Sequence, residues 1–440
     1  VKKVEEYQPD VITISLLEST YPIALAMVDA IEYYIKKNDV KFLAGGVFAY
    51  SAPEIVLSND NFTAVVHGEG EGALVEFCKR IQSGEDYHDI KNLSYMEDGQ
   101  IIKNPLRPLE DISNQPIPDY SLFMSERFLR PMGGKVYTCI PIETNRGCPY
   151  LCAFCNSPTT LDMYKGKVKG SFFRKKSIEA IQKELRYLIN EWNGEYVYFT
   201  SDTFILFTDE EFEQFIDMYS EFKLPFWIQT RAETVTEYRI KKLKEIGCHR
   251  MSMGLEHGNY EFRKEVVIKK FDDQTYIDAT KLISEAGVPL SINNIIGFPD
   301  ETRDLVFDTI ELNRKLIFDT TNAFPYAPFH GTSLQKLCLE RGYITNEFNP
   351  GSLNVDVPLD MPQLSRDEIS GLRRTFALYA RMPKEYWPEI KRAEKDDEEG
   401  NKLYNSLTQI YQEKFFGVHK DDDGNELPKD DIQRTSAVYD

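Results

Sequence analysis

Residues 136–155 read VYTCIPIETNRGCPYLCAFC, in which a β-forming run leads directly into three closely spaced cysteines. From this strand onward, strand-like apolar runs alternate with segments of helical periodicity, and the pattern repeats six times. Such alternation is typical of a parallel sheet whose strands are joined by right-handed helical crossovers. A closed barrel of this type needs eight strands, and the rest of the chain does not supply two more. The sequence therefore predicts an α/β fold with an open (β/α)6 partial TIM-type barrel.

The expected elements divide the chain into four regions. The barrel, over 136–345, has expected strands at 136–144, 196–201, 225–230, 250–255, 289–297 and 320–326, and expected helices at 177–192, 209–222, 236–246, 273–286 and 301–316. In front of it, β-forming runs at 11–15, 42–44 and 63–66 and a helical stretch at 21–37 predict a partial Rossmann-like domain over 1–90. Residues 91–135 are rich in proline and are expected to be a linker with little regular structure. A charged region with helices near 366–380 and 399–415, and a further charged run at 420–423, spans 346–440 and is expected to cap the barrel opening.

Cys148, Cys152 and Cys155 stand at C-x3-C-x2-C spacing in the loop after the first barrel strand. Three thiolates at this spacing can reach three corners of one cubane iron–sulfur cluster, which leaves the fourth iron open for chemistry. Loops after barrel strands also line the functional face of such folds. Two alternatives remain, a zinc site and ordinary buried thiols. Structural zinc takes four ligands, and the candidates that would have to come from other strands are Cys139, His249 and His257.

The cysteine motif, with aromatic Phe154 before its third cysteine, resembles that of the radical S-adenosylmethionine (SAM) superfamily. The resemblance implies a [4Fe-4S] cluster whose open iron chelates the amino and carboxylate groups of SAM. One electron from an external donor such as flavodoxin or ferredoxin then cleaves SAM, and the 5'-deoxyadenosyl radical abstracts hydrogen from a substrate.

Further motifs of the superfamily follow in the expected order. Phe199–Phe204 resembles the segment that contacts the methionyl amino group, GLEHG at 254–258 the ribose-binding "G-x-E-x-G" stretch, and GFPDET at 297–302 the "G-x-P-x-E-T" turn beside adenine. PFHGT at 328–332 is similar to the "P-G-T" turn, although His330 stands where proline is usual. The SAM contacts that the resemblance implies are Phe154, Ser201, Asp202, Arg231, Ser252, Glu256 and Gly297.

The N-terminal domain carries its conspicuous residues at strand ends, in Ser15–Thr20, Gly45-Gly46 and HGEGE at 67–71. Ligands of open α/β sheets bind along that carboxyl edge, and glycines permit close backbone approach. In this order, ahead of a radical SAM motif, the segments resemble the cobalamin-binding domain of cobalamin-dependent radical SAM proteins. The cobalamin contacts implied are Ser15, Thr20, Gly45, Gly46, Gly68, Glu69 and Gly70. A Rossmann-like domain that packs but binds nothing is the alternative.

Two features depart from that family pattern. The usual first strand and helix of the domain are missing, so we expect an N-terminally truncated sequence. The Asp-x-His-x-x-Gly motif for a lower cobalt ligand is also absent, and Asp86–Lys91, which mimics only its start, is interpreted as a solvated loop. We further expect His67 to begin a turn, and Cys139 and Cys248 to lie in the core.

Composition restricts the class of partner. With 52 basic and 71 acidic residues the net charge is −19, which argues against a nucleic-acid groove. The absence of an apolar run of about 18 residues argues against a membrane span. Seven cysteines, three of them clustered, fit a reducing cytoplasm better than a disulfide framework.

Three reactions remain open at this point. The first is cobalamin-dependent methylation of a carbon in a small-molecule, lipid-precursor or peptide substrate. The second is oxidation or ring closure with the same cofactors, as in relatives of the anaerobic magnesium-protoporphyrin cyclase. The third, tRNA methylthiolation, is disfavoured by the acidic charge and by the lack of a second cysteine triad. The sequence predicts no particular catalytic residue or substrate.

Overall fold

The computed structural model describes residues 1–132, 134–349, 351 and 357–416. Their backbone contacts divide the chain into two compact units. The first unit contains the described residues of 1–111, 149–172 and 326–360, and the second those of 112–148, 173–325 and 361–440. The predicted charged run at 420–423 lies outside the described residues.

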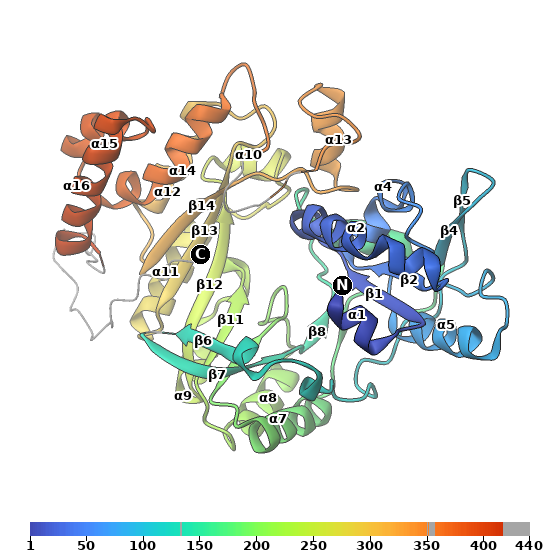
Figure 1. Cartoon of the computed structure of the whole chain (residues 1–440). Coiled ribbons are helices and arrows are strands. Elements are labelled where there is room, and N and C mark those ends of the chain that lie inside the picture. Colours follow the sequence, from blue (N-terminus) through green and yellow to red (C-terminus); the bar gives the residue numbers. More distant parts are fainter. Residues whose placement is uncertain (133, 350, 352–356, 417–440) are drawn as a thin grey trace. The chain divides into compact units, whose positions relative to one another are not determined.

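The second unit is built around a seven-stranded curled sheet in the order β14-β13-β12-β11-β10-β7-β6 (Figure 1). Six of these strands are parallel, and β6 is antiparallel to β7 at the edge. The strands are β6 (Leu129–Met132), β7 (Lys135–Ile142), β10 (Tyr196–Phe199), β11 (Phe226–Thr230), β12 (Cys248–Glu256), β13 (Leu290–Ile296) and β14 (Thr320–Pro325). Because neighbours in the sheet are also consecutive parallel strands of the chain, the predicted open (β/α)6 partial barrel is confirmed.

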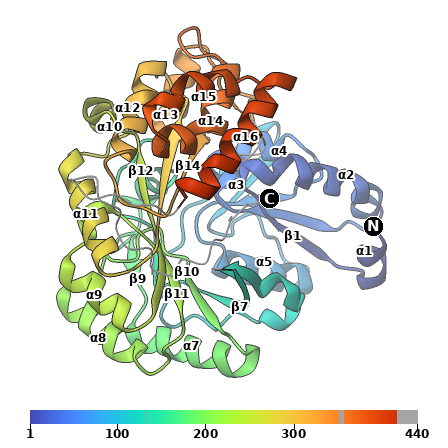
Figure 2. The same cartoon turned by 90° about the vertical axis from the view of Figure 1, so that its left-hand side faces the viewer.

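The crossover helices lie along the outer side of this sheet (Figure 2). They are α7 (Ile178–Trp192), α8 (Asp209–Tyr219), α9 (Glu237–Glu245), α11 (Asp273–Glu285) and α12 (Arg303–Asn313). Each begins after a Ser, Thr or Asp whose side chain accepts a hydrogen bond from the first-turn backbone, which satisfies an amide that the helix itself leaves unpaired. Their apolar faces bury the strands in one core. Smaller elements are α10 (Tyr260–Glu265), η2 (Tyr120–Leu122), η3 (Ser125–Phe128), η4 (Ala232–Thr234) and the β8–β9 pair (Asn145–Arg146 and Arg174–Lys175).

The C-terminal part of the second unit is helical, as predicted, with α14 (Arg366–Arg381), η5 (Lys384–Tyr386), α15 (Trp387–Ala393) and α16 (Glu398–Lys414). Helix α14 packs against β14 and α12, and α15 and α16 pack on each other. None of the helices in the described part of the chain is long and apolar enough to cross a membrane.

The first unit contains a five-stranded sheet in the order β1-β2-β3-β4-β5. Strands β1 (Val11–Ser15), β2 (Lys41–Gly45) and β3 (Ala64–Val66) are parallel. Along β2, Phe42 and Ala44 pack into one apolar cluster with helix α2 (Tyr21–Lys37), whereas Leu43 packs into a second cluster with α5 (Glu71–Ser83). Since alternate side chains of a strand point to opposite faces, the sheet is covered on both sides, as a Rossmann-like domain requires. Further helices are α1 (Lys2–Tyr7), η1 (Glu18–Thr20), α3 (Val47–Ser51), α4 (Pro53–Leu57), α6 (Ser157–Tyr164) and α13 (Ser333–Glu340).

The expectation of little regular structure over 91–135 is wrong for its first part. Strands β4 (Leu93–Glu97) and β5 (Gln100–Lys103) form a hairpin that extends the first sheet antiparallel to β3. Asp98 and Gly99 both adopt positive φ, 47° and 74°, the backbone that a two-residue hairpin turn requires. In the sequence, the Asp98-Gly99 pair between two short alternating runs indicates this hairpin more directly than the prolines of the region indicate a linker.

Candidate cofactor site

The cluster loop begins where β7 ends. The Thr144 amide donates a hydrogen bond to Ser201 Oγ at 3.2 Å, and the two hydroxyl oxygens lie 2.6 Å apart, so the loop is tied to the carboxyl end of β10. Ser201 is thus placed at the strand end that the sequence predicts, with its hydroxyl used partly for structure.

The three motif cysteines differ in burial. Cys148 and Cys152 are buried and Cys155 is partly exposed, while the Ser157 amide lies 3.4 Å from Cys155 Sγ and donates to it. Hydrogen bonds to sulfur tune the potential of a cluster, so this amide is suited to a thiolate ligand. Among the described residues, no three His, Cys, Asp or Glu side chains are grouped closely enough to hold a single metal ion. Thiolates on separate irons of a cubane need not converge in that way.

Polar side chains follow at the ends of the next two strands. Asp202 follows β10 and is exposed as a residue, but neighbouring protein atoms surround its carboxyl group. The resulting desolvation raises the pKa of this carboxyl, and the negative charge of Glu143 raises it further. Its remaining contact with solvent screens part of this effect. Arg231, after β11, is buried, and its Nε lies 2.5 Å from Glu233 Oε1. An ammonium group near Asp202 would favour the charged carboxylate and reverse the raised pKa.

Glu256, at the end of β12, is held in an unusual conformation. Its φ is 67°, and the register with β13 shifts between Gly254 and Glu256. Buried Lys269 donates to the Gly254 carbonyl at 2.6 Å and to Glu256 Oε1 at 3.2 Å. A positive φ in a residue other than glycine is strained and recurs where a side chain must be aimed. Nearby, Ser252 Oγ accepts a hydrogen bond from Asn293 Nδ2 at 2.9 Å, across β12 and β13.

The Gly297 turn after β13 is organised by a fully buried carboxylate. Glu301 Oε2 accepts hydrogen bonds from the amides of Gly297 at 2.5 Å and Phe298 at 3.0 Å. Its other oxygen lies 3.0 Å from His257 Nε2, and His257 Nδ1 accepts from the Asn259 amide at 3.1 Å. Since Nδ1 is an acceptor, the proton is on Nε2, which donates to Glu301. The sequence gives His257 only as a possible zinc ligand and names neither Glu301 nor Lys269 as a site residue, although Glu301 is the acidic residue of the "G-x-P-x-E-T" pattern.

The first unit presents glycines along the carboxyl edge of its sheet, and they have different roles. A Cβ on Gly45 would meet nothing within 4 Å, whereas one on Gly46, with φ 87°, would lie 2.7 Å from the Leu16 carbonyl oxygen. A Cβ on Gly68 would collide with the Tyr164 hydroxyl, and on Gly70 it would be 3.6 Å from a Val66 methyl. The open space beside Gly45 is the feature that fits a flat cofactor approaching the backbone.

Of the other residues predicted at this edge, Thr20 and Glu69 form local hydrogen bonds. Ser15 and Thr20 are exposed, and the Thr20 hydroxyl donates to the Leu17 carbonyl at 3.1 Å. Glu69 is buried, and its Oε2 accepts from the Glu110 amide at 2.8 Å. The contacts of Ser15, Thr20 and Glu69 with cobalamin stay predictions.

His67 and two cysteines lie as expected. His67 Nε2 donates to the Asn104 carbonyl at 3.1 Å and Nδ1 lies 2.8 Å from Ser94 Oγ; burial lowers the pKa of this imidazole from 6.5 to about 4. Both nitrogens are therefore used within the domain, in agreement with a turn. Cys139 and Cys248 are buried, and burial raises the pKa of both thiols.

Comparisons with known proteins agree with these two parts of the fold. Residues 142–312 match the Radical SAM superfamily, and residues 1–78 match the B12 binding domain. The uncharacterized methyltransferase PH0819 of Pyrococcus horikoshii is 28% identical over 87% of this chain and 81% of its own length. The methyltransferase TsrM from Kitasatospora setae, solved with tryptophan and a SAM analogue, aligns with a TM-score of 0.62 at 16% identity, over 78% of this chain and 68% of TsrM. OxsB, solved with aqua-cobalamin and SAM, aligns with a TM-score of 0.64 at 17% identity, over 93% of this chain and 64% of OxsB.

The match over residues 142–312, which include the cysteine loop, identifies a radical SAM domain within the partial barrel. A B12 binding domain precedes that core, so the chain has the two domains, in the same order, that the resemblance to cobalamin-dependent radical SAM proteins implies. The two domain matches imply a [4Fe-4S] cluster, SAM and cobalamin as cofactors.

Proposed function

We propose that the chain is a methyltransferase that uses SAM and cobalamin to methylate a carbon of a small-molecule, lipid-precursor or peptide substrate. The observation that carries this proposal is the tandem of a B12-binding and a radical SAM match within a chain that resembles a methyltransferase over 87% of its length. Residues 346–440 are proposed to select the substrate, and an external flavodoxin or ferredoxin to supply electrons. The net charge of −19 favours an enzyme that does not bind nucleic acid, and the seven cysteines, three of them clustered, favour a reducing cytoplasm.

The cofactors supply methyl transfer and radical generation, and the protein binds, orients and shields them. Cys148, Cys152 and Cys155 hold the cluster. Asp202 accepts hydrogen bonds from the methionyl ammonium of SAM, and its carboxylate form is the one that binds. Glu256, fixed by Lys269, accepts from the ribose hydroxyls.

The Gly297–Phe298 turn would hold the adenine end of SAM, and Glu301 fixes this turn by accepting hydrogen bonds from its two backbone amides. In the first unit, Gly45 leaves the backbone bare so that cobalamin can approach it. Such fixed contacts convert encounters between bound reactants into an oriented reaction.

The test is product analysis with the full chain. Protein purified without oxygen is reconstituted with iron, sulfide and hydroxocobalamin, then mixed with SAM, reductant and a panel of candidate substrates. Both 5'-deoxyadenosine and S-adenosylhomocysteine are expected, with roughly four iron atoms per chain. Cys152→Ala is expected to abolish both products, whereas Cys78→Ala, which changes an exposed cysteine outside the motif, is expected to leave them unchanged.

Other outcomes assign the remaining reactions. Deoxyadenosine without S-adenosylhomocysteine contradicts methyl transfer and supports oxidation or ring closure. Roughly eight iron atoms per chain would indicate a second cluster and favour methylthiolation. If a protein with an intact cluster forms neither product, the proposal is contradicted.

A further inference from the structure

A buried carboxylate–imidazole pair lies in the first unit and has no part in the function proposed above. Glu18 begins η1, directly after β1, and His330 lies in the loop between β14 and α13, 312 residues further along the chain. Their exposed fractions are 5% and 7%. Two ionisable side chains at this depth are uncommon unless they are paired or bind something.

The pair fixes the orientation of the imidazole. Glu18 Oε1 accepts a hydrogen bond from the His330 amide at 2.5 Å and lies 2.7 Å from His330 Nδ1. A carboxylate oxygen only accepts, so Nδ1 carries a proton and the neutral ring has its lone pair on Nε2. The loop itself is held by Asn156, which donates to the His330 carbonyl at 3.0 Å, and by Thr159, which donates to the Gly331 carbonyl at 2.8 Å.

The second ring nitrogen is left without a protein partner. Among the described residues, His330 Nε2 is buried and makes no hydrogen bond. Most buried polar atoms in native proteins are hydrogen-bonded, and an exception needs an explanation such as a bound group. The ring also packs edge-on against Phe48, with centroids 5.4 Å apart, so it cannot turn to find another partner without disturbing that contact.

The neighbours of the ring lie at the edge of the sheet where a ligand would bind. Glu18 follows β1, and Phe48 lies in α3, which starts directly after Gly45 and Gly46 at the end of β2. Both belong to the carboxyl edge where open α/β sheets bind ligands and to the segment that matches the B12 binding domain. In metal sites, moreover, a histidine that ligates through one nitrogen commonly donates the other N–H to a carboxylate.

We propose that His330 Nε2 contacts the bound cobalamin directly, oriented by Glu18. The contact is either a bond to cobalt or a hydrogen bond accepted from an amide side chain of the corrin, and the experiment below separates these two. The inference rests on cobalamin binding and is independent of whether the enzyme methylates or oxidises its substrate.

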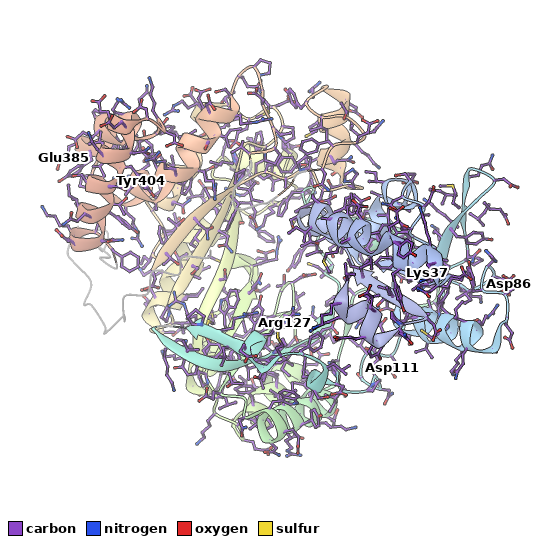
Figure 3. All side chains as sticks on the ribbon, viewed as in Figure 1. Lys37, Asp86, Asp111, Arg127, Glu385 and Tyr404 are labelled. Atoms are coloured by element: carbon purple, nitrogen blue, oxygen red, sulfur yellow. The ribbon has the colours of Figure 1, made fainter. Side chains whose placement is uncertain are left out.

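The decisive variant is His330→Asn in the full chain. The Asn amide can still donate to Glu18 in place of Nδ1, but it ends short of the Nε2 position. The matched control is His88→Gln. Asp86, labelled in Figure 3, forms a second carboxylate–imidazole pair with His88 at 2.5 Å, and both of its side chains are exposed, at 71% and 46%. Binding of hydroxocobalamin is followed by absorbance, and binding of SAM by calorimetry.

We expect His330→Asn to weaken cobalamin binding at least tenfold while SAM binding and thermal unfolding of the cobalamin-free protein stay unchanged. His88→Gln should bind cobalamin as the unmodified chain does. Electron paramagnetic resonance of bound cob(II)alamin in protein with 15N-labelled histidine then identifies the contact. An altered nitrogen splitting indicates a bond to cobalt, and an unaltered spectrum together with weakened binding indicates a hydrogen bond to the corrin.

Three results overturn the proposal. The first is unchanged cobalamin affinity and an unchanged spectrum in His330→Asn. The second is a parallel loss of SAM binding or of folding, which would make the pair a structural tie. The third is a loss of cobalamin binding in His88→Gln but not in His330→Asn, which would assign the imidazole contact to the exposed loop.

Discussion

Replacing Glu301 with Gln changes the buried support of the Gly297 turn while almost preserving its shape. The carboxylate accepts from two amides through Oε2 and from His257 Nε2 through Oε1. A Gln side chain has one oxygen, and its NH2 group must face either the imidazole N–H or the two amides. The imidazole cannot exchange its proton to help, because Nδ1 already accepts from Asn259. A donor therefore faces a donor in either orientation.

The magnitude follows from the bonds that are lost or weakened. An unsatisfied buried donor costs about 1–3 kcal/mol, and a hydrogen bond to a charged group exceeds a neutral one by about 1 kcal/mol. Since Glu301 is fully buried, solvent does not relieve this, and we expect the turn to be destabilised by about 2–4 kcal/mol. At 1.4 kcal/mol per factor of ten, local opening becomes roughly 30- to 700-fold more frequent.

Hydrogen exchange measured by mass spectrometry reads this opening directly and needs no cluster. Peptides that cover residues 295–302 should exchange faster by the factor above, whereas peptides over the β4–β5 hairpin serve as an internal reference. Glu261→Gln is the matched control, because Glu261 is exposed and forms only a 3.6 Å surface ion pair with Lys264; we expect it to change stability by less than about 0.5 kcal/mol. Exchange of residues 295–302 in Glu301→Gln within threefold of the unmodified protein would refute the reasoning.

Three further results are expected. In calorimetric titrations, SAM affinity should fall as the pH drops through the raised pKa of Asp202. Asp202→Asn should bind SAM weakly at every pH. A steep dependence of SAM affinity on pH in this variant would contradict the role given to Asp202. Folding lowers the pKa of His67 from 6.5 to about 4, so on acidification the unfolded chain takes up a proton before the folded one. In urea unfolding of the cofactor-free protein, the free energy of unfolding should therefore fall by about 2 kcal/mol between pH 7 and roughly pH 5. An equal fall in His67→Gln would exclude this cause. Gly46→Ala places a Cβ 2.7 Å from the Leu16 carbonyl oxygen at positive φ and should lower the free energy of unfolding by about 2 kcal/mol or more. Gly45→Ala should fold normally but bind hydroxocobalamin more weakly. Normal binding by Gly45→Ala would show that Gly45 does not face the cofactor.

The strands and helices of the barrel could be predicted because their signal is local. Each strand is a short apolar run, and each crossover helix combines an apolar face with a capping Ser, Thr or Asp within about three residues of its start. The β4–β5 hairpin departs from the expectation although its Asp98-Gly99 turn is equally local, because the prolines of residues 91–135 taken together predict a linker. Neighbouring residues thus suffice to predict where strands and helices lie, provided that each possible turn is examined for residues such as Asp-Gly.

The supports of the site could not be predicted in this way. Glu301 and His257 are 44 residues apart, and Glu18 and His330 are 312 apart, so neither pairing leaves a pattern in a single sequence. His330 was noticed only as a departure from the usual proline. Lys269 reaches Glu256 across 13 residues, past the short helix α10, and no local pattern marks that pairing.

These supports share a physical arrangement that bears on the order of binding and folding. In each unit a buried charged side chain satisfies backbone groups at or near a strand end: Glu301 at Gly297, Lys269 at Gly254, and Glu18 at His330. Because these bonds are made by the protein alone, the loops need no cofactor to reach their conformation. Ordering of the loop then costs little when the cofactor binds. The positive φ of Glu256 and the unpaired Nε2 of His330 are the exceptions, since neither is relieved within the described residues. Ligand binding should relieve the unpaired Nε2 and make use of the strained Glu256, and these two positions are therefore where occupancy by cofactor should stabilise the fold most.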